Sequence, residues 1–275
     1  MIVLGGSSRQ SLAALRVALD NTLKGVSAGD ASAISSDLFK ALVAIDSSTG
    51  LRRALTDSSR DSSSKSDLIS DLFKKSLGGP ALALLANATA LRWSAPSGIA
   101  DAIEQIAVEA EATAANLSNS LDQVQSEIFI FSKLLIENPD LRTALSERSQ
   151  SAEAKQALIK SIFGSKFSAS TNSLLAHSVE SRRARSIEKT ISAYSHAVTA
   201  RRNRVNAHIK SSIALSDGQA KKLADSLTKQ IGQPVHLNIE IDPSILGGIS
   251  IRFGDEVIDG TISNRLAEAS RALVS

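Results

Sequence analysis

The stretch Leu51-Arg-Arg-Ala-Leu55 returns 90 residues later as Leu141-Arg-Thr-Ala-Leu145. When residues 51–92 are aligned with residues 141–182 without a gap, 13 of the 42 positions are identical. Phe39 with Phe129 carries the match upstream. Because the register holds through polar segments as well as apolar ones, we interpret the pattern as an internal repeat of one folded unit. This repeat decides the fold of most of the chain.

Apolar residues in both copies follow the spacing of α-helices. In the first copy Leu38, Leu42 and Ile45 share one helical face, and in the second Leu141 and Leu145 form the buried stripe. Aromatic residues are few, with seven Phe, one Trp and one Tyr, and aliphatic cores of this kind favour packed helices over β-sandwiches. We therefore expect two bundles of amphipathic helices.

Several segments are predicted to begin, end or link these helices. Residues 57–66 are polar, rich in serine and without periodicity, so we expect a loop. Gly78-Gly79-Pro80 breaks the chain again, and Asn138 is a good N-cap residue before Pro139 at the first helical position. Residues 99–131 are expected to form one or two long amphipathic helices between the copies.

The pattern changes near residue 205. Ser216-Asp-Gly-Gln219 is a capping box that opens a helix. Residues 235–241 and 249–253 then alternate apolar and polar side chains, which predicts two half-buried strands, and a short third strand is expected near Val257-Ile258. A compact α+β segment therefore follows the helices.

The expected fold class is mainly α, with two consecutive helical-bundle repeats followed by a small α+β C-terminal domain. The expected domains are residues 1–98 for the first repeat, 99–205 for the second bundle and 206–275 for the α+β domain. Ile262, Leu266 and Leu273 have the spacing of a final helix.

Composition and motifs argue against catalysis. The chain has 275 residues, a net charge of +3 and no cysteine, which excludes disulfides and thiolate chemistry. Its four histidines have no metal-ligand spacing, and no phosphate-binding glycine loop occurs. We expect no catalytic residue, no cofactor and no metal. The most apolar stretch, residues 81–91, is too short for a membrane span, and no secretory signal is evident, so a cytosolic protein is expected.

A basic run from Arg182 to Lys210 leaves an alternative open. It holds eight lysines and arginines against one acid, Glu188, and is expected to continue as a long helix. Such a helix could bind an acidic protein, nucleic acid or anionic lipid, or could simply be a solvated face. Tyr194 is its one aromatic residue, so it offers no stacking platform for nucleic acid. The alternative function is a basic helical adaptor acting through 182–210.

The tail of the chain resembles a known family. Ile241-Asp-Pro-Ser-Ile-Leu-Gly-Gly-Ile-Ser-Ile-Arg-Phe-Gly-Asp255, followed by Val257-Ile-Asp-Gly-Thr-Ile262, resembles the signature of the delta subunit of bacterial F-type ATP synthases, related to the mitochondrial oligomycin-sensitivity-conferring protein. Asn138-Pro-Asp-Leu-Arg142 up to Lys155 resembles the helical bundle of that family. The family-motif residues, expected to serve structure or interaction, are Asp242, Pro243, Gly247, Gly248, Gly254, Asp255 and Asp259.

The resemblance implies a non-catalytic subunit of the peripheral stalk. Such a subunit links the catalytic head to the membrane-anchored stalk and is needed to couple proton transport to ATP synthesis. It implies that the helical region holds alpha subunits of the head and that the C-terminal domain holds b-type stalk subunits. It also implies a peripheral position on the cytoplasmic face of the cell membrane, with no nucleic acid bound.

The resemblance covers roughly residues 100–275, and the common family member lacks the preceding hundred residues. The repeat explains these as a duplicated helical bundle, a long form that resembles actinobacterial delta subunits. We expect the second copy to carry the alpha contact, because it adjoins the tail, and the first copy to brace the stalk.

Overall fold

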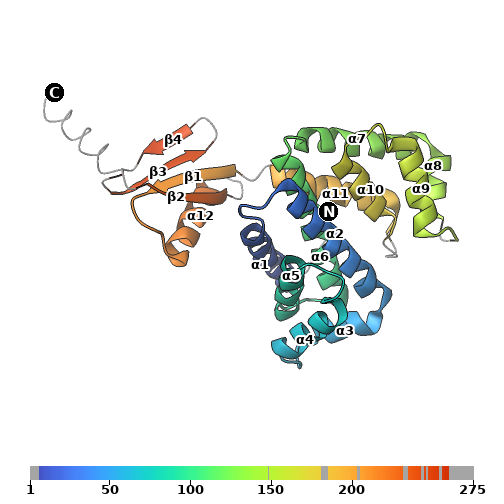
Figure 1. Cartoon of the computed structure of the whole chain (residues 1–275), viewed down its shortest axis with the longest axis horizontal. Helices are drawn as coiled ribbons and strands as arrows, with labels where there is room; N and C mark the ends of the chain where they lie inside the picture. The colour runs from blue at the N-terminus through green and yellow to red at the C-terminus, as the bar shows by residue number, and fades with distance from the viewer. Residues whose placement is uncertain are drawn as a thin grey trace, which may run out of the picture. The chain divides into compact units, whose positions relative to one another are not determined.

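The computed structural model of the chain describes residues 6–147, 149–180, 185–202, 205–231, 235–242, 245, 247–253 and 256–259. The chain forms two compact units, residues 1–201 and 202–275 (Figure 1). The first is helical, and the described part of the second holds a small sheet with one helix. The mainly α class with an α+β C-terminal region is therefore confirmed, while the expected helix at 262–273 lies outside the described residues.

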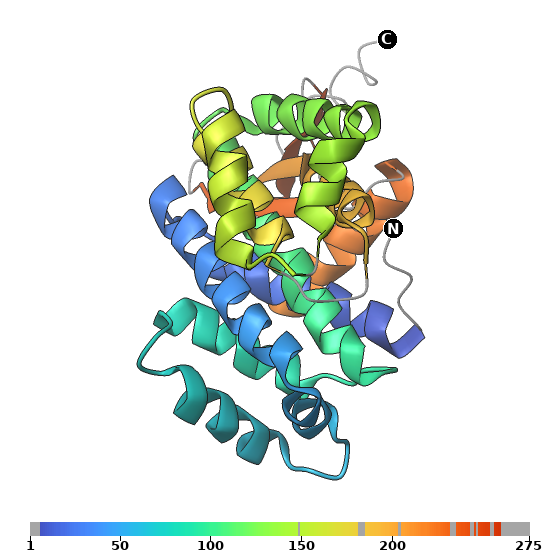
Figure 2. The same ribbon diagram turned by 90° about the vertical axis from the view of Figure 1, so that its right-hand side faces the viewer.

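The described part of the helical unit contains eleven helices. Their bounds are α1 (Gly6–Thr22), α2 (Ala28–Ser47), α3 (Thr49–Thr56), α4 (Ser62–Phe73), α5 (Gly79–Ala90), α6 (Pro96–Leu117), α7 (Leu121–Glu137), α8 (Pro139–Ser146), α9 (Ala152–Phe163), α10 (Ala169–Ser178) and α11 (Ile187–Arg202). Figure 2 shows the long helices α2 and α6 lying side by side, and this pair has the most extensive contact between helices in the described unit.

Helix bounds follow the 90-residue offset of the sequence. Helices α3, α4 and α5 begin at Thr49, Ser62 and Gly79, and helices α8, α9 and α10 begin at Pro139, Ala152 and Ala169. Leu55 and Leu145 are both buried, and Leu51 and Leu141 both lie half-buried against the core. When α11 is shifted back by 90 residues in the sequence, it aligns with the first part of α6. Helix α6 is therefore the last helix of the first series and the first helix of the second.

One hydrogen bond occurs at equivalent places in both copies. The Asp37 carboxylate accepts from the backbone N–H of Gly78 at 2.8 Å, at the start of α5. The Glu127 carboxylate accepts from the backbone N–H of Ser168 at 2.9 Å, at the start of α10. Each carboxylate satisfies an N–H that the helix itself leaves unpaired, and its charge faces the positive end of the helix dipole. The same tertiary contact therefore fixes the fifth helix of each series.

Helix α6 is the centre of the helical unit. Fifteen of its 22 residues are buried, on all sides of the helix, which is typical of a helix surrounded by others. The buried apolar residues of both copies form one continuous cluster from Leu12 to Val198. The boundary expected at 98/99 therefore lies inside one compact unit, in the first turn of α6.

Three buried glutamates tie other helices to α6. Glu104, Glu109 and Glu111 are each only 1% exposed, so each needs a hydrogen-bonding partner. Their partners are Arg185 and Tyr194 for Glu104, Arg16 for Glu109 and Ser32 for Glu111. These contacts join α1, α2 and the α11 region to the one central helix.

Two details of the helical region differ from the sequence analysis. The loop expected at 57–66 is shorter, because α4 begins at Ser62 and buries Lys65 as its first turn packs on the core. Serine is frequent both in loops and at helix starts, so its density misled the prediction. Asn138 does stand before the first turn of α8, but its side chain donates to the Leu134 carbonyl of α7 and does not cap α8.

The C-terminal unit has a four-stranded sheet in the described residues, in the order β2-β1-β3-β4. Its elements are β1 (Val205–Ser211), α12 (Asp217–Ile231), β2 (Val235–Ile241), β3 (Ile249–Phe253) and β4 (Glu256–Asp259). β1 pairs with β2 in parallel and with β3 antiparallel, and β4 pairs antiparallel with β3. Leu223 and Leu227 of α12 pack on Ile209 and Ile251 of the sheet.

The strands at 235–241, 249–253 and 257–258 are confirmed, as is the capping box. The Ser216 N–H donates to the Gln219 side chain at 2.9 Å, and the Gln219 N–H donates back to the Ser216 hydroxyl at 3.4 Å. The long helix expected through Lys210 is wrong, because α11 ends at Arg202 and Val205–Ser211 is an inner strand. The fully buried Ile209 pairs with Ile251 there, so sheet pairing decides this segment.

Candidate interaction surfaces

Four of the seven family-motif residues lie in the described structure. Asp242 and the Gly247-Gly248 pair lie in the connection from β2 to β3, and Asp259 ends β4. Pro243, Gly254 and Asp255 lie outside the described residues. The register places the four at one end of the sheet, because Ser211 of β1 lies between Ile241 and Ile249 while Ser250 faces Asp259.

The glycine pair occupies backbone conformations that other residues avoid. Gly247 has φ 153° and Gly248 has φ 86°, immediately before β3. A side chain at Gly248 would strain the backbone at this turn by about 1–3 kcal/mol. The pair therefore sets how the chain enters β3.

Asp242 connects the strand ends through its backbone and its carboxylate. Its N–H donates to the Ser211 carbonyl at 2.9 Å. Lys210 Nζ lies 3.4 Å from the Asp242 carboxylate and 3.9 Å from that of Glu240. These ion pairs are solvent-accessible, so each adds little to stability, about 0–1 kcal/mol. Asp242 therefore orders the end of β2.

Apolar side chains are exposed near this end of the C-terminal unit. Ile241 is 56% exposed and Ile239 is 38% exposed, two residues apart on β2. Ile213, just after β1, is 69% exposed. β2 is an edge strand of the described sheet, and exposed apolar residues beside such an edge favour docking of another chain. The motif residues and this apolar surface lie at the same end of the sheet.

The described basic side chains of the 182–210 stretch are largely engaged within the protein. Arg185 donates to both oxygens of the buried Glu104 carboxylate. Arg201 pairs with Asp20 of α1 and donates to Thr113 of α6 at 2.8 Å. These arginines hold α11 and the segment before it on the helical core, so they are unavailable as a continuous basic face.

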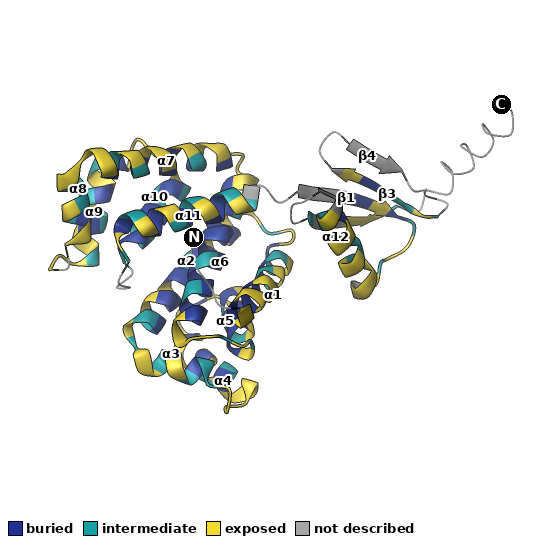
Figure 3. Ribbon diagram, turned by 180° about the vertical axis from the view of Figure 1, so that it is seen from behind, coloured by how far each residue is buried: buried dark blue, intermediate teal, exposed yellow. Residues whose placement is uncertain are grey.

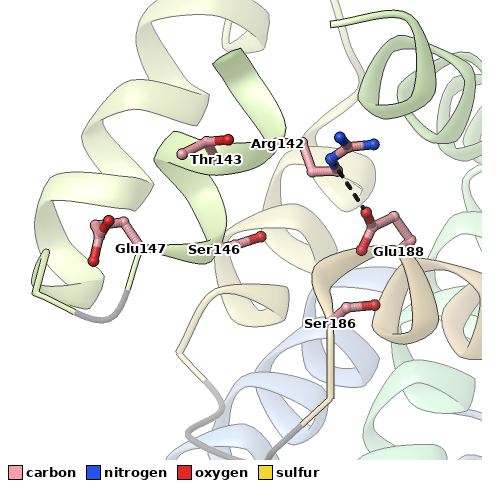
Figure 4. Close-up of a pocket in the computed structure, with 6 residues that line it drawn as sticks. All are labelled: Arg142, Thr143, Ser146, Glu147, Ser186 and Glu188. Carbon is pink, nitrogen blue, oxygen red and sulfur yellow. Dashed lines mark ion pairs between the residues drawn. The ribbon is translucent and has the colours of Figure 1, made fainter. Parts of the chain in front are cut away.

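The helical unit also has an open polar pocket of about 440 Å³ between α8 and the start of α11. Figure 4 shows Arg142 and Glu188 facing each other across it, with Arg142 Nε 3.7 Å from Glu188 Oε1. The other described lining residues are Thr143, Ser146, Glu147 and Ser186. Its carboxylates are Glu147 and Glu188, and the Glu188 carboxylate faces the Arg142 guanidinium. The pocket is an open surface notch spanned by that exposed ion pair.

The described residues contain no group of three or more His, Asp or Glu placed to hold a metal ion. In that same part of the chain, every helix is too short or too polar to cross a membrane.

A helical unit with one continuous core and a small α+β unit with exposed apolar side chains at a sheet edge are features typical of proteins that bind other proteins. Comparison with known proteins identifies the family. The family model described as ATP synthase delta (OSCP) subunit matches residues 100–273, beginning in α6. The preceding residues correspond to the first copy of the repeat.

Relatives match the whole length of the chain. The ATP synthase subunit delta of Streptomyces griseus is 36% identical over 270 residues, covering 98% of this chain and 99% of the relative. That of Streptomyces coelicolor is 37% identical over 270 residues, with 98% of each chain covered, and that of Thermobifida fusca is 34% identical over 268 residues, again with 98% of each covered. The chain belongs to the ATP synthase delta (OSCP) subunit family.

Proposed function

We propose that the protein is a non-catalytic peripheral-stalk subunit of an F-type ATP synthase, linking the catalytic head to the membrane-anchored stalk. The observation that carries this proposal is family membership, with relatives that match 98% of the chain, including the helical residues before position 100. Such a link is needed to couple proton transport to ATP synthesis, because an unanchored head would turn with the rotor.

The packing of the helical unit suits a part that carries torque. A stator must transmit force without deforming, and close-packed interiors deform little. All the described helices from α1 to α11 contribute to one core, and the buried glutamates of α6 fix its neighbours by hydrogen bonds and ion pairs. The two copies therefore respond to force as one body.

We assign different partners to the two compact units. The helical unit is proposed to hold alpha subunits of the head, with the second copy as the principal site because the family model begins with it. The C-terminal unit is proposed to hold b-type stalk subunits, and Ile239, Ile241 and Ile213 are the exposed apolar side chains that support this. The protein would then be peripheral to the cytoplasmic face of the membrane through the complex.

A basic adaptor acting through 182–210 is not favoured. The run is divided between α11 and β1, and Arg185, Arg201 and Lys210 pair with acidic side chains of the chain itself. That adaptor would bind duplex DNA or anionic vesicles in a strongly salt-dependent manner. We expect the isolated protein to show neither this binding nor micromolar binding of ATP by calorimetry.

The proposal is tested by reconstitution. Membranes stripped of the head and of this subunit are given purified head with or without the full chain. We expect the chain to restore sedimentation of the head with membranes and ATP-driven proton pumping. A heat-unfolded sample of the chain is the control. Equal head retention and pumping without the chain would contradict the function.

A further inference from the structure

The equivalent helices α2 and α7 differ on one face. Both bury the same core stripe, because Ala31, Ile34, Leu38, Ala41 and Ile45 and their counterparts Leu121, Val124, Ile128, Phe131 and Leu135 are all buried. A second stripe lies beside the core stripe, and its central residues are buried on α2, whereas every residue of the α7 stripe is half-buried or exposed. On α2 it consists of Ser32, Ser35, Phe39, Leu42 and Asp46, and on α7 of Asp122, Gln125, Phe129, Ser132 and Ile136.

Other helices of the chain cover the second stripe of α2. The Ser35 hydroxyl donates to the Ala107 carbonyl of α6 at 2.8 Å. The Phe39 ring stacks on His177 of α10 at 4.1 Å between centroids and lies 6.1 Å from the ring of Tyr194 on α11. Phe39 is 1% exposed as a result. In the first copy, this stripe is a helix-packing interface.

The corresponding stripe on α7 is more exposed to solvent than that on α2, and its C-terminal end is more apolar. Phe129, the counterpart of Phe39, is 70% exposed, and Ile136, the counterpart of Asp46, is 68% exposed. Ile130 beside them is 47% exposed. Figure 3 shows exposed residues along the outer side of α7. Helix α11 touches the stripe at Gln125, whose amide donates to Thr199 at 3.0 Å.

The spacing of the stripe defines what fits it. Gln125, Phe129, Ser132 and Ile136 alternate steps of four and three residues, the pattern along which one helix packs lengthwise on another. Lys133 lies between Phe129 and Ile136 with its side chain 66% exposed, and its Nζ has Glu137 at 3.7 Å. A partner helix therefore needs an apolar stripe of two turns with an acidic side chain placed to meet Lys133.

We propose that the stripe of α7 around Phe129 and Ile136 docks an amphipathic helix, bearing an acidic residue, from another subunit of the ATP synthase. The partner helix replaces on α7 the cover that α10 and α11 supply to α2. The inference rests on the proposed function, since the partner belongs to the same assembly. A second copy of this chain is the competing occupant.

Single cysteines test this directly, because the chain has none of its own. Phe129→Cys and Ile136→Cys are compared with Val43→Cys, a control on α2 that is 42% exposed in the wild-type protein. Maleimide labelling is timed in the isolated chain at several concentrations and in ATP synthase reconstituted from stripped membranes and purified head. We expect fast labelling of all three in the isolated chain, and labelling about tenfold slower at positions 129 and 136 after assembly, with little change at position 43.

A double variant, Phe129→Ser with Ile136→Ser, measures the affinity. We expect it to melt like the wild type. We expect its affinity for stripped membranes supplied with purified head to be at least about tenfold lower, because aromatic anchors dominate such interfaces. Protection at 129 no greater than at 43 in an assembled, pumping complex would overturn the docking site alone. Labelling at 129 that is already slow in the isolated chain, and becomes slower as the protein concentration increases, would assign the face to a second copy. That result would also overturn the proposed docking site. Failure of the wild-type chain to assemble would overturn the proposed function.

Discussion

The two copies of the helical repeat keep one set of contacts and differ in another. Leu55 and Leu145, Lys65 and Lys155, and Phe73 and Phe163 are buried in pairs at the same offset. The stripe of α2 around Phe39 is covered, whereas the corresponding stripe of α7 is open. The contacts shared by both copies are those that the helical fold requires. The contacts found in the first copy alone, around Phe39, join the two copies to each other, and the open stripe of α7 is the docking surface proposed above.

The largest expected effect comes from the two equivalent phenylalanines. Phe39→Ala should lower the free energy of unfolding by about 3–5 kcal/mol, since it removes a buried ring from between two helices. Phe129→Ala should change it by less than about 0.5 kcal/mol, because the ring is already in water. Urea denaturation of both variants measures the difference. Equal losses would show that the two faces are not distinct.

Equivalent core leucines should behave alike. Leu55 is fully buried and Leu145 is 3% exposed, each in the short third helix of its series. Leu55→Ala and Leu145→Ala should each cost about 2–4 kcal/mol through lost burial and the cavity left behind. Because both copies share the core around α6, each variant should unfold in one transition of the helical unit. Separate thermal transitions by calorimetry would instead show two independent bundles.

The capping carboxylates should have smaller, matched effects. Asp37→Asn and Glu127→Gln each weaken a charged hydrogen bond to the first turn of a helix, and each should cost about 1–2 kcal/mol. The two losses of stability can be compared directly, because the Asp37 and Glu127 carboxylates accept from backbone N–H groups at equivalent positions of the two copies. Guanidinium titrations at neutral pH measure both losses, and a loss at only one site would separate the two caps.

Glu127 also predicts a pH dependence. Burial raises the pKa of Glu127, but hydrogen bonds from Thr171, Ser168 and Gln123 outweigh it and hold the pKa below its ordinary value. The folded pKa is thus lower than the unfolded one, so its stabilisation is complete above the unfolded pKa and disappears as the pH falls through the folded pKa. The stability gap between wild type and Glu127→Gln should therefore narrow on acidification. A gap that widens in acid would contradict the sign.

Much of the helical fold could be predicted from the sequence, because local signals agree with tertiary packing. Apolar spacing placed Leu38, Leu42 and Ile45 in the core, where they are found. The starts of α5 at Gly79 and α8 at Pro139 follow from glycine and proline. Such signals depend on residues that are close in the sequence. The 90-residue repeat added the prediction of which helices occupy equivalent places in the two copies.

Features that depend on distant partners could not be predicted. Val205–Ser211 carries lysine and histidine and follows an arginine-rich helix, so its role as an inner strand depends on pairing with β2 and β3. The three glutamates of α6 are buried because Arg16, Ser32 and Arg185 reach them from far along the chain. Phe39 and Phe129 are the same residue in the same repeat position, and only the packing distinguishes them.

The most direct test of the account is to separate the two compact units. A chain ending at Arg202 retains the helical unit and lacks the sheet with Asp242 and the Gly247-Gly248 turn. On stripped membranes it should still bind the purified head, yet fail to tether the head to the membrane, and ATP hydrolysis should proceed without proton pumping. The full chain should restore both. Equal pumping by the shortened and the full chain would contradict the assignment of stalk binding to the C-terminal unit, and with it the proposed link between head and membrane.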